Sequence, residues 1–161
     1  MRKILLAVFS FAIWLLLTWT VNWQSLLVGG IVSLLVGLLF GNLFVEKPGR
    51  VLQPKRWFWF LVYIPVFLWE MAKANFDVAF RVIHPKMPIN PGIVKIKTNI
   101  QSEMGKTILA NSITLTPGTF TVDLKDQYLY IHWINVRTED INEASEKIAG
   151  RFENLLIKIF D

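Results

Sequence analysis

The hydrophobic and polar positions divide the chain into an apolar first part and a mixed second part. Residues 4–45 contain no Asp, Glu, Lys, Arg or His, and about 20 apolar residues are enough to cross a bilayer. The run is broken only near Thr20-Val21-Asn22-Trp23-Gln24. The pattern therefore predicts a transmembrane hairpin with helices over about 4–19 and 25–45.

The basic residues around this hairpin predict its orientation. Basic side chains precede and follow it, whereas the connecting turn has none, so both ends of the hairpin are expected on the cytoplasmic side. The flanking basic residues are Arg2, Lys3, Lys47, Arg50, Lys55 and Arg56. The same reasoning places the remainder of the chain in the cytoplasm.

A third helix is predicted over residues 57–83. An apolar run over 57–69 is followed by a charged stripe at intervals of three and four residues, which share one helical face: Glu70, Lys73, Asp77 and Arg81. The segment could cross the membrane with this stripe buried against a partner, or lie at the membrane surface as an amphipathic helix. We favour the surface or partly inserted helix, because a full crossing would send the rest of the chain outward. Glu70 is expected to pair with Lys73 rather than to carry protons.

The chain after residue 83 predicts a Pro-rich linker over 84–91 and a small cytoplasmic α/β domain over 92–161, following a membrane domain over 1–83. Strands are expected near 93–98, 119–124 and 128–135, with Ser102 capping the helix between the first two. Phe120, Val122 and Leu124 should share one face of the second strand. One amphipathic helix should end the chain, giving the order β-α-β-β-α with helices on one face of the sheet. Its apolar positions are Ile141, Ala144, Ile148, Phe152, Leu155 and Ile159.

Small residues recur every fourth position in the second apolar helix, and we call them the glycine stripe: Gly29, Ser33, Gly37 and Gly41. Small side chains let helix backbones approach closely in lipid, where hydrophobicity does not drive association. The stripe predicts close packing, either on a neighbouring subunit or on the first helix of the same hairpin.

Candidate chemistry is sparse. The chain has no cysteine, and it shows no HExxH, glycine-rich phosphate loop or GxSxG. His132 sits in an alternating strand, and Asp123 and Asp126 flank a hairpin turn, where Asp is favoured for local hydrogen bonds. No catalytic, cofactor or metal residue is predicted. Residues 1–83 carry eight Lys and Arg against three acids, and residues 84–161 carry nine against nine, which is unlike a nucleic-acid-binding protein.

One segment carries a family resemblance. Thr116-Pro117-Gly118-Thr119 fits a β-turn with Pro second and Gly third, where a positive φ is needed. Taken with its flanks, the segment resembles the E subunit of the Mrp-type multisubunit cation/proton antiporters of prokaryotes. The residues that carry the resemblance are Asn111, Ser112, Thr114, Thr116, Pro117, Gly118, Thr119 and Asp123.

The resemblance implies an accessory subunit of a plasma-membrane complex that couples Na⁺ efflux to H⁺ uptake, with other hydrophobic subunits and the lipid bilayer as partners. In that family the ion-translocating residues belong to the large subunits, and a role in assembly and full activity is implied here. The uncharged hairpin points the same way, because ion paths in membranes are marked by ionisable side chains. The alternatives are a free-standing membrane adaptor or scaffold and a membrane-anchored enzyme.

Overall fold

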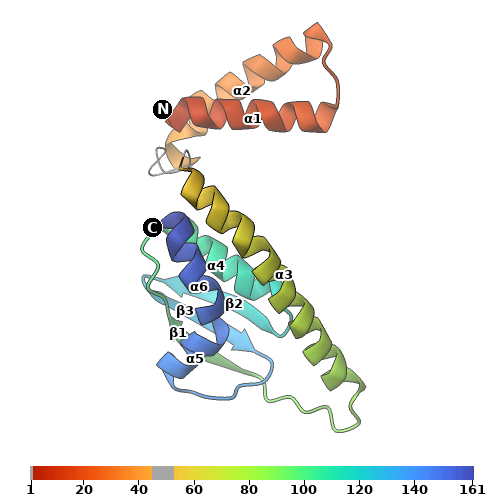
Figure 1. Cartoon of the computed structure of the whole chain (residues 1–161), viewed down its shortest axis with the longest axis vertical. Coiled ribbons are helices and arrows are strands. Elements are labelled where there is room, and N and C mark those ends of the chain that lie inside the picture. Colours follow the sequence, from red (N-terminus) through yellow and green to blue (C-terminus); the bar gives the residue numbers. More distant parts are fainter. Residues whose placement is uncertain (1, 45–52) are drawn as a thin grey trace. The chain divides into compact units, whose positions relative to one another are not determined.

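The computed structural model describes residues 2–44 and 53–161, which form parts of two compact units, Met1–Gln53 and Pro54–Asp161. The helix predicted over 57–83 belongs to the second unit, together with the C-terminal sheet, rather than to the hairpin with which the sequence pattern grouped it. Figure 1 shows the elements of both units.

The first unit is the predicted helical hairpin. Its helices are α1 (Arg2–Thr18) and α2 (Trp23–Phe44), so both bounds lie within two residues of those predicted. At 1.5 Å per residue their lengths are about 26 and 33 Å. Within the described residues, Trp23–Asn42 is the one stretch long and apolar enough to cross a membrane by length and composition. Near the turn, Trp14 Nε1 donates a hydrogen bond to Ser25 Oγ at 3.2 Å.

The second unit begins with α3 (Pro54–Ile83), one continuous helix of 30 residues. It starts at a proline, which suits a first helical position because the missing N–H has no intrahelical partner there. Its Tyr63 joins the core of the C-terminal sheet domain, and Phe67 packs against that core. Figure 1 shows α3 running beside the domain. The predicted helix is therefore confirmed, and it is an integral part of the domain.

The remaining elements are β1 (Gly92–Lys97), α4 (Glu103–Leu115), β2 (Thr119–Lys125), β3 (Tyr128–Trp133), α5 (Ile141–Ile148) and α6 (Gly150–Phe160). The three strands form an antiparallel sheet in the order β1-β3-β2. The predicted Ser102 cap is present, because its side chain accepts a hydrogen bond from Gly105 N–H. The β-α-β-β order is as predicted.

The single C-terminal helix that the sequence predicts is in fact two helices. α5 ends at Ile148 and α6 begins at Gly150, with Ala149 fully buried between them. Glycine is a poor helix former, costing about 1 kcal/mol relative to alanine, so the chain can change direction here. Ile148 and Phe152 both join the core across this break.

The second strand also differs from its predicted alternation. A register shift lies between Thr121 and Asp123, and a bulge of this kind turns the following residues to the other face. Leu124 therefore packs against the core, whereas Phe120 and Val122 are 55% and 51% exposed. The prediction that these three share a face is wrong. The bulge fits the contacts of Thr121, whose Oγ1 donates to Ala110 O of α4 at 3.0 Å.

The core lies between the sheet and its helices. Its fully buried side chains come from the strands, from the loop after β1, from α4 and from α6, and they include Ile96, Ile100, Leu109, Ile113, Leu129, Ile131 and Leu156. α3 packs on α6 on the side away from the sheet. The Pro-rich segment over 84–91 is tied to the same unit, because Asn90 N–H donates to Ile134 O and Asn90 O accepts from Val136 N–H.

Candidate functional site

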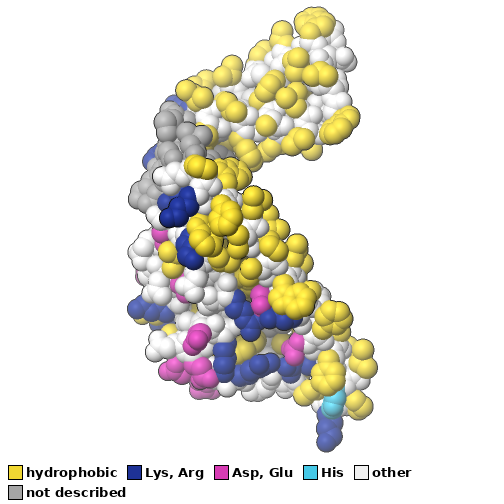
Figure 2. All heavy atoms as spheres, viewed as in Figure 1, with side chains coloured by type: hydrophobic (Ala, Val, Ile, Leu, Met, Phe, Trp, Pro, Cys, Tyr) yellow, Lys and Arg dark blue, Asp and Glu magenta, His cyan; other side chains and the backbone are white. Residues whose placement is uncertain are grey.

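The two faces of α3 differ in chemistry. The charged stripe faces the C-terminal domain, where Glu70 is 9% exposed and Arg81 is 8% exposed. The opposite side exposes large apolar side chains along most of the helix, among them Trp57, Phe58, Leu61, Leu68, Trp69, Phe76 and Phe80. Figure 2 shows hydrophobic side chains along the outward side of α3 and basic side chains gathered beside its second half, toward the domain.

Glu70 is held by two cations. Lys73 Nζ lies 2.7 Å from Glu70 Oε1, which is the predicted helix ion pair. Arg151 of α6 binds the other carboxylate oxygen. Burial acts to raise the pKa of Glu70, but the hydrogen bonds and charges of Lys73 and Arg151 outweigh it and lower the pKa below its ordinary 4.5. The carboxylate therefore stays ionised at neutral pH and links α3 to α6.

Asp77 and Arg81 form the second pair of the stripe. Arg81 Nε and Nη2 donate to the two carboxylate oxygens of Asp77 at 2.8 and 3.1 Å. These hydrogen bonds lower the pKa of Asp77 below its ordinary 3.8, and the charges of Arg81 and Arg137 act in the same direction against burial. Arg81 Nη1 also donates to Pro88 O at 2.6 Å. This pair fastens the Pro-rich segment to the end of α3.

The Thr116-Pro117-Gly118-Thr119 segment forms the predicted turn. Thr119 N–H donates to Thr116 O at 3.2 Å, and Gly118 has a φ of +89°. A Cβ atom on Gly118 would lie 3.0 Å from Ile134 Cγ2 and 3.3 Å from Val78 Cγ2. Gly118 is thus required both by its backbone conformation and by the close approach of α3.

Hydroxyl groups around this turn join α4 to its neighbours. Thr119 Oγ1 donates to Ile113 O at 2.7 Å, and Thr121 N–H donates to Thr114 Oγ1 at 3.2 Å. Ser112 is buried, donates to Ile108 O and shares a short hydrogen bond with Tyr63 Oη of α3. The family segment therefore acts as a joint between α3, α4 and β2.

Two residues of the family segment take no part in this joint. Asn111 is exposed on α4. Asp123 is also exposed, and its carboxylate accepts a hydrogen bond from Leu124 N–H, beside the bulge. Asp123 thus has the local backbone role that the turn-flanking position predicts.

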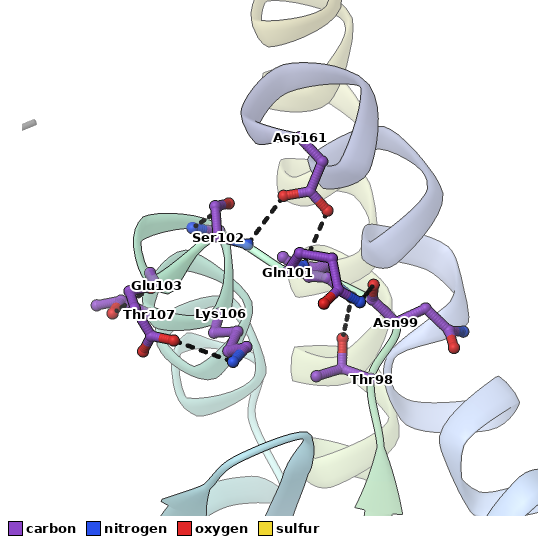
Figure 3. Close-up of polar contacts among 10 residues, drawn as sticks. Thr98, Asn99, Gln101, Ser102, Glu103, Lys106, Thr107 and Asp161 are labelled. Carbon is purple, nitrogen blue, oxygen red and sulfur yellow. Dashed lines mark hydrogen bonds and ion pairs between the residues drawn. The ribbon is translucent and has the colours of Figure 1, made fainter. Parts of the chain in front are cut away.

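The start of α4 is fixed by the last residue of the chain. The Asp161 carboxylate accepts hydrogen bonds from Gln101 and Ser102 N–H, each at 3.0 Å. Figure 3 shows the Asp161 side chain pointing from the end of α6 toward these two residues. A negative charge is favourable at a helix N-terminus, so this contact joins α6 to α4.

A cleft of about 460 Å³ brings the charged stripe and the turn together. We call it the basic cleft, because four cations line it: Lys73, Arg137, Lys147 and Arg151. Its other lining residues are Glu70, Ala74, Asp77, Ile113, Thr116, Pro117, Thr119, Trp133, Ile148 and Phe152. Two groups of residues that the sequence analysis singled out separately thus meet at one site.

The glycine stripe lies in the other unit and packs within it. A Cβ atom on Gly29 would fall 2.4 Å from the Trp14 ring, and one on Gly37 would fall 2.5 Å from Lys3 O. A Cβ on Gly41 would likewise collide with Lys3, and Ser33 is 3% exposed. The stripe therefore faces α1 of the same hairpin, which is one of the two packing partners that the sequence left open.

Sequence reasoning missed Arg137, Lys147 and Arg151. Arg137 follows β3, Lys147 lies in α5 and Arg151 lies in α6. Lys147 and Arg151 are four residues apart, a spacing that marks one face of the single helix predicted there, so the sequence did carry a signal for this pair. Among the residues that the structure describes, no group of three or more His, Asp or Glu is placed to hold a metal ion.

Comparison with known proteins identifies a family of ion transporters. A family model described as "Na+/H+ ion antiporter subunit" matches residues 7–159. The Na⁺/H⁺ antiporter E subunit of Alkalihalophilus pseudofirmus is 37% identical over 98 residues, which cover 60% of this chain and 61% of that relative. The corresponding E1 subunit of Staphylococcus haemolyticus is 33% identical over 134 residues, which cover 79% of this chain and 82% of that relative.

A solved structure resembles the whole chain. It belongs to the membrane-bound sulfane sulfur reductase, an archaeal respiratory membrane complex, and one of its chains matches with a TM-score of 0.87 and 46% identity. The match covers 99% of both chains.

Proposed function

Because the chain belongs to the family of E subunits of Mrp-type Na⁺/H⁺ antiporters, we propose that it is an accessory, non-conducting subunit of a multisubunit cation/proton antiporter in a prokaryotic plasma membrane. The family is one of transporters rather than of enzymes. The observation that carries the proposal is the uncharged hairpin: residues 4–45 contain no ionisable side chain. Intramembrane ion paths are normally marked by such side chains.

The proposed contribution of the chain is assembly. The hairpin is closely packed within itself through the glycine stripe, which supports its use as a preformed unit that docks against the large subunits. The joint formed by the family segment holds α3 on the domain, which supports a structural role for the Thr116-Pro117-Gly118-Thr119 turn. Both features support a structural role in the complex rather than a role in conducting ions.

A double change of Pro117→Ala and Gly118→Ala tests this role. Complex assembly and Na⁺/H⁺ exchange are measured separately, the first by co-elution in a gentle detergent and the second in membrane vesicles. We expect assembly and exchange to fall together, because the turn holds the subunit's shape. Lost exchange in a normally assembled complex would refute the structural role.

We propose that α3 lies at the cytoplasmic membrane surface with its apolar side toward lipid. The domain contacts α3 near both of its ends: Arg56 donates to Ile159 O, and Val78 lies against Gly118. A helix that crosses a bilayer is surrounded by lipid or other membrane segments over about 20 residues, which conflicts with a charged domain along its length. The cytoplasmic side follows from the basic residues that flank the hairpin.

Thiol labelling tests this topology, because the natural chain has no cysteine. Val21→Cys places a thiol in the hairpin turn, and Lys125→Cys places one in the sheet domain, at exposed positions. A membrane-impermeant reagent added to intact cells should label the first and spare the second until the membrane is opened. Labelling of Lys125→Cys in intact cells would show that the sheet domain lies outside the cell, opposite to the proposed orientation.

A second candidate function is supported by the solved structure. The chain is 46% identical over 99% of its length to a chain of the sulfane sulfur reductase complex, compared with 33–37% to the antiporter E subunits described above. This favours a place in the membrane part of a respiratory complex. Purification in a gentle detergent distinguishes the two, because co-elution with sulfane sulfur reductase activity would support the respiratory complex. A free-standing adaptor would instead elute by itself.

A further inference from the structure

The basic cleft has a surplus of positive charge, supplied by separate elements. Lys73 comes from α3, Arg137 from the segment after β3, Lys147 from α5 and Arg151 from α6. All of them belong to the second compact unit. The cleft also contains Glu70 and Asp77, so its net charge depends on how these carboxylates are paired.

The ion pairs around the basic cleft leave part of its positive charge uncompensated. Glu70 forms ion pairs with Lys73 and Arg151, and Asp77 forms one with Arg81. Glu143 forms an ion pair with Lys147, with 2.6 Å between Nζ and Oε1. Arg137 influences Asp77 through its charge, and its guanidinium makes no hydrogen bond within the described part of the chain. Together, Lys73, Arg81, Arg137, Lys147 and Arg151 bring five positive charges to three carboxylates. The surplus is two positive charges.

This arrangement suits an anion that carries two charges and several acceptor oxygens. The planar fork of Arg matches phosphate oxygens, and Lys binds phosphate as a point charge. Arg137 and Lys147 are exposed, and neither is bonded to a buried acid, so they can turn toward a ligand without breaking a buried contact. Arg151 is also partly exposed, and it can support a ligand while it stays bonded to Glu70. At about 460 Å³ the cleft is larger than a bare ion needs.

We propose that the basic cleft binds a phosphate ester group, with Arg137 and Lys147 as its principal ligands and Arg151 in support. The phosphate can belong to a phospholipid headgroup or to a soluble phosphate compound. The binding goes beyond the accessory role proposed above and does not depend on which complex the chain joins.

Binding to the full-length chain in maltoside micelles tests the proposal, at low ionic strength because screening weakens exposed charge pairs. The probes are inorganic phosphate, followed by calorimetry, and short-chain phosphatidic acid beside the diacylglycerol of the same chain length. These two lipids differ only in the phosphate. The variant is Arg137→Gln with Lys147→Gln, and its control is Lys97→Gln with Lys125→Gln, which removes the same charge from exposed sites on the sheet.

We expect the cleft variant to bind phosphate or phosphatidic acid at least about tenfold more weakly, since it loses two charge-assisted contacts. The control should change affinity by less than about twofold, because distant surface charges are screened. Binding of both probes indicates a site open to soluble phosphates, and binding of phosphatidic acid only indicates a lipid headgroup. Either result supports the proposal.

The proposal is overturned if neither probe binds, if diacylglycerol binds as well as phosphatidic acid, or if the control variant loses as much affinity as the cleft variant. Circular dichroism checks that each variant is folded. If the double variant does not fold, the single variant Arg137→Gln replaces it in the binding test, because this side chain makes no hydrogen bond to another part of the described chain. The single variant should bind the probe about threefold more weakly.

Discussion

Replacing Gly37 with alanine should open the hairpin, whereas the same change at Gly30 should not. A Cβ on Gly37 would lie 2.5 Å from Lys3 O and 2.8 Å from Ala7 Cβ. Non-bonded carbon contacts are normally about 3.5–4.0 Å, so α1 and α2 would have to separate by about 1 Å. The obstacle includes backbone, which cannot rotate away as a side chain can.

The two substitutions should affect the stability of the hairpin differently. Inserting a methyl group into a closely packed site costs about 1–3 kcal/mol. Gly30 belongs to the same helix, but a Cβ there meets no atom within 4 Å. Gly30→Ala should therefore be neutral, or stabilising by up to about 1 kcal/mol from helix propensity. Comparing Gly37→Ala with Gly30→Ala therefore separates the effect of packing from the effect of removing a glycine.

Energy transfer between two dyes measures the hairpin directly. Ile4→Cys and Asn42→Cys supply the only thiols of the chain, at exposed positions near the open end, where Lys3 lies against Gly41. The dyes are followed while the full chain is titrated with SDS in mixed micelles. Gly37→Ala should lose energy transfer at a lower SDS fraction than the parent, and Gly30→Ala should not. Equal midpoints for the two variants would refute the close-packing argument.

Further outcomes are expected for the stability of the second unit. Gly118→Ala should lower the free energy of unfolding by about 1–2 kcal/mol, because an L-residue is strained at positive φ, and Pro117→Ala by at most about 1 kcal/mol; denaturant titration measures both. Tyr63→Phe should cost about 0.5–1.5 kcal/mol in the same assay through the lost hydrogen bond. Stability should fall as the pH is lowered through the depressed pKa values of Glu70 and Asp77, since their contribution is complete only above the ordinary values of 4.5 and 3.8. Glu70→Gln should flatten this acid dependence.

Features with local causes could be predicted from the sequence. The helices of the hairpin follow from an uninterrupted apolar run and a short polar turn, and their observed bounds lie within two residues of those expected. Ser102 caps α4 because its hydroxyl needs only an N–H three residues ahead. Gly118 could be predicted to have a positive φ because it follows Pro117 in a turn.

Features that depend on contacts between distant parts of the chain could not be predicted from the sequence. The alternation of Phe120, Val122 and Leu124 is a local pattern, but the bulge accompanies hydrogen bonds between Thr121 and α4, which sequence spacing does not reveal. The basic cleft is harder still, because Arg137 and Arg151 meet α3 only through the fold. No periodicity joins them to the charged stripe.

The charged stripe shows how a correct local prediction can leave the partner open. Its spacing placed Glu70 and Arg81 on one face of a helix, and a crossing of the membrane would have needed a neighbouring subunit to bury them. Arg151 of the same chain already holds Glu70, and Pro88 O holds Arg81. The face of α3 that lacks a covering within its own unit is the apolar one, which exposes Trp69 and Phe76 by 65% and 78%. The contacts that α3 still requires are therefore apolar, and they lie on the side of the helix opposite the charges.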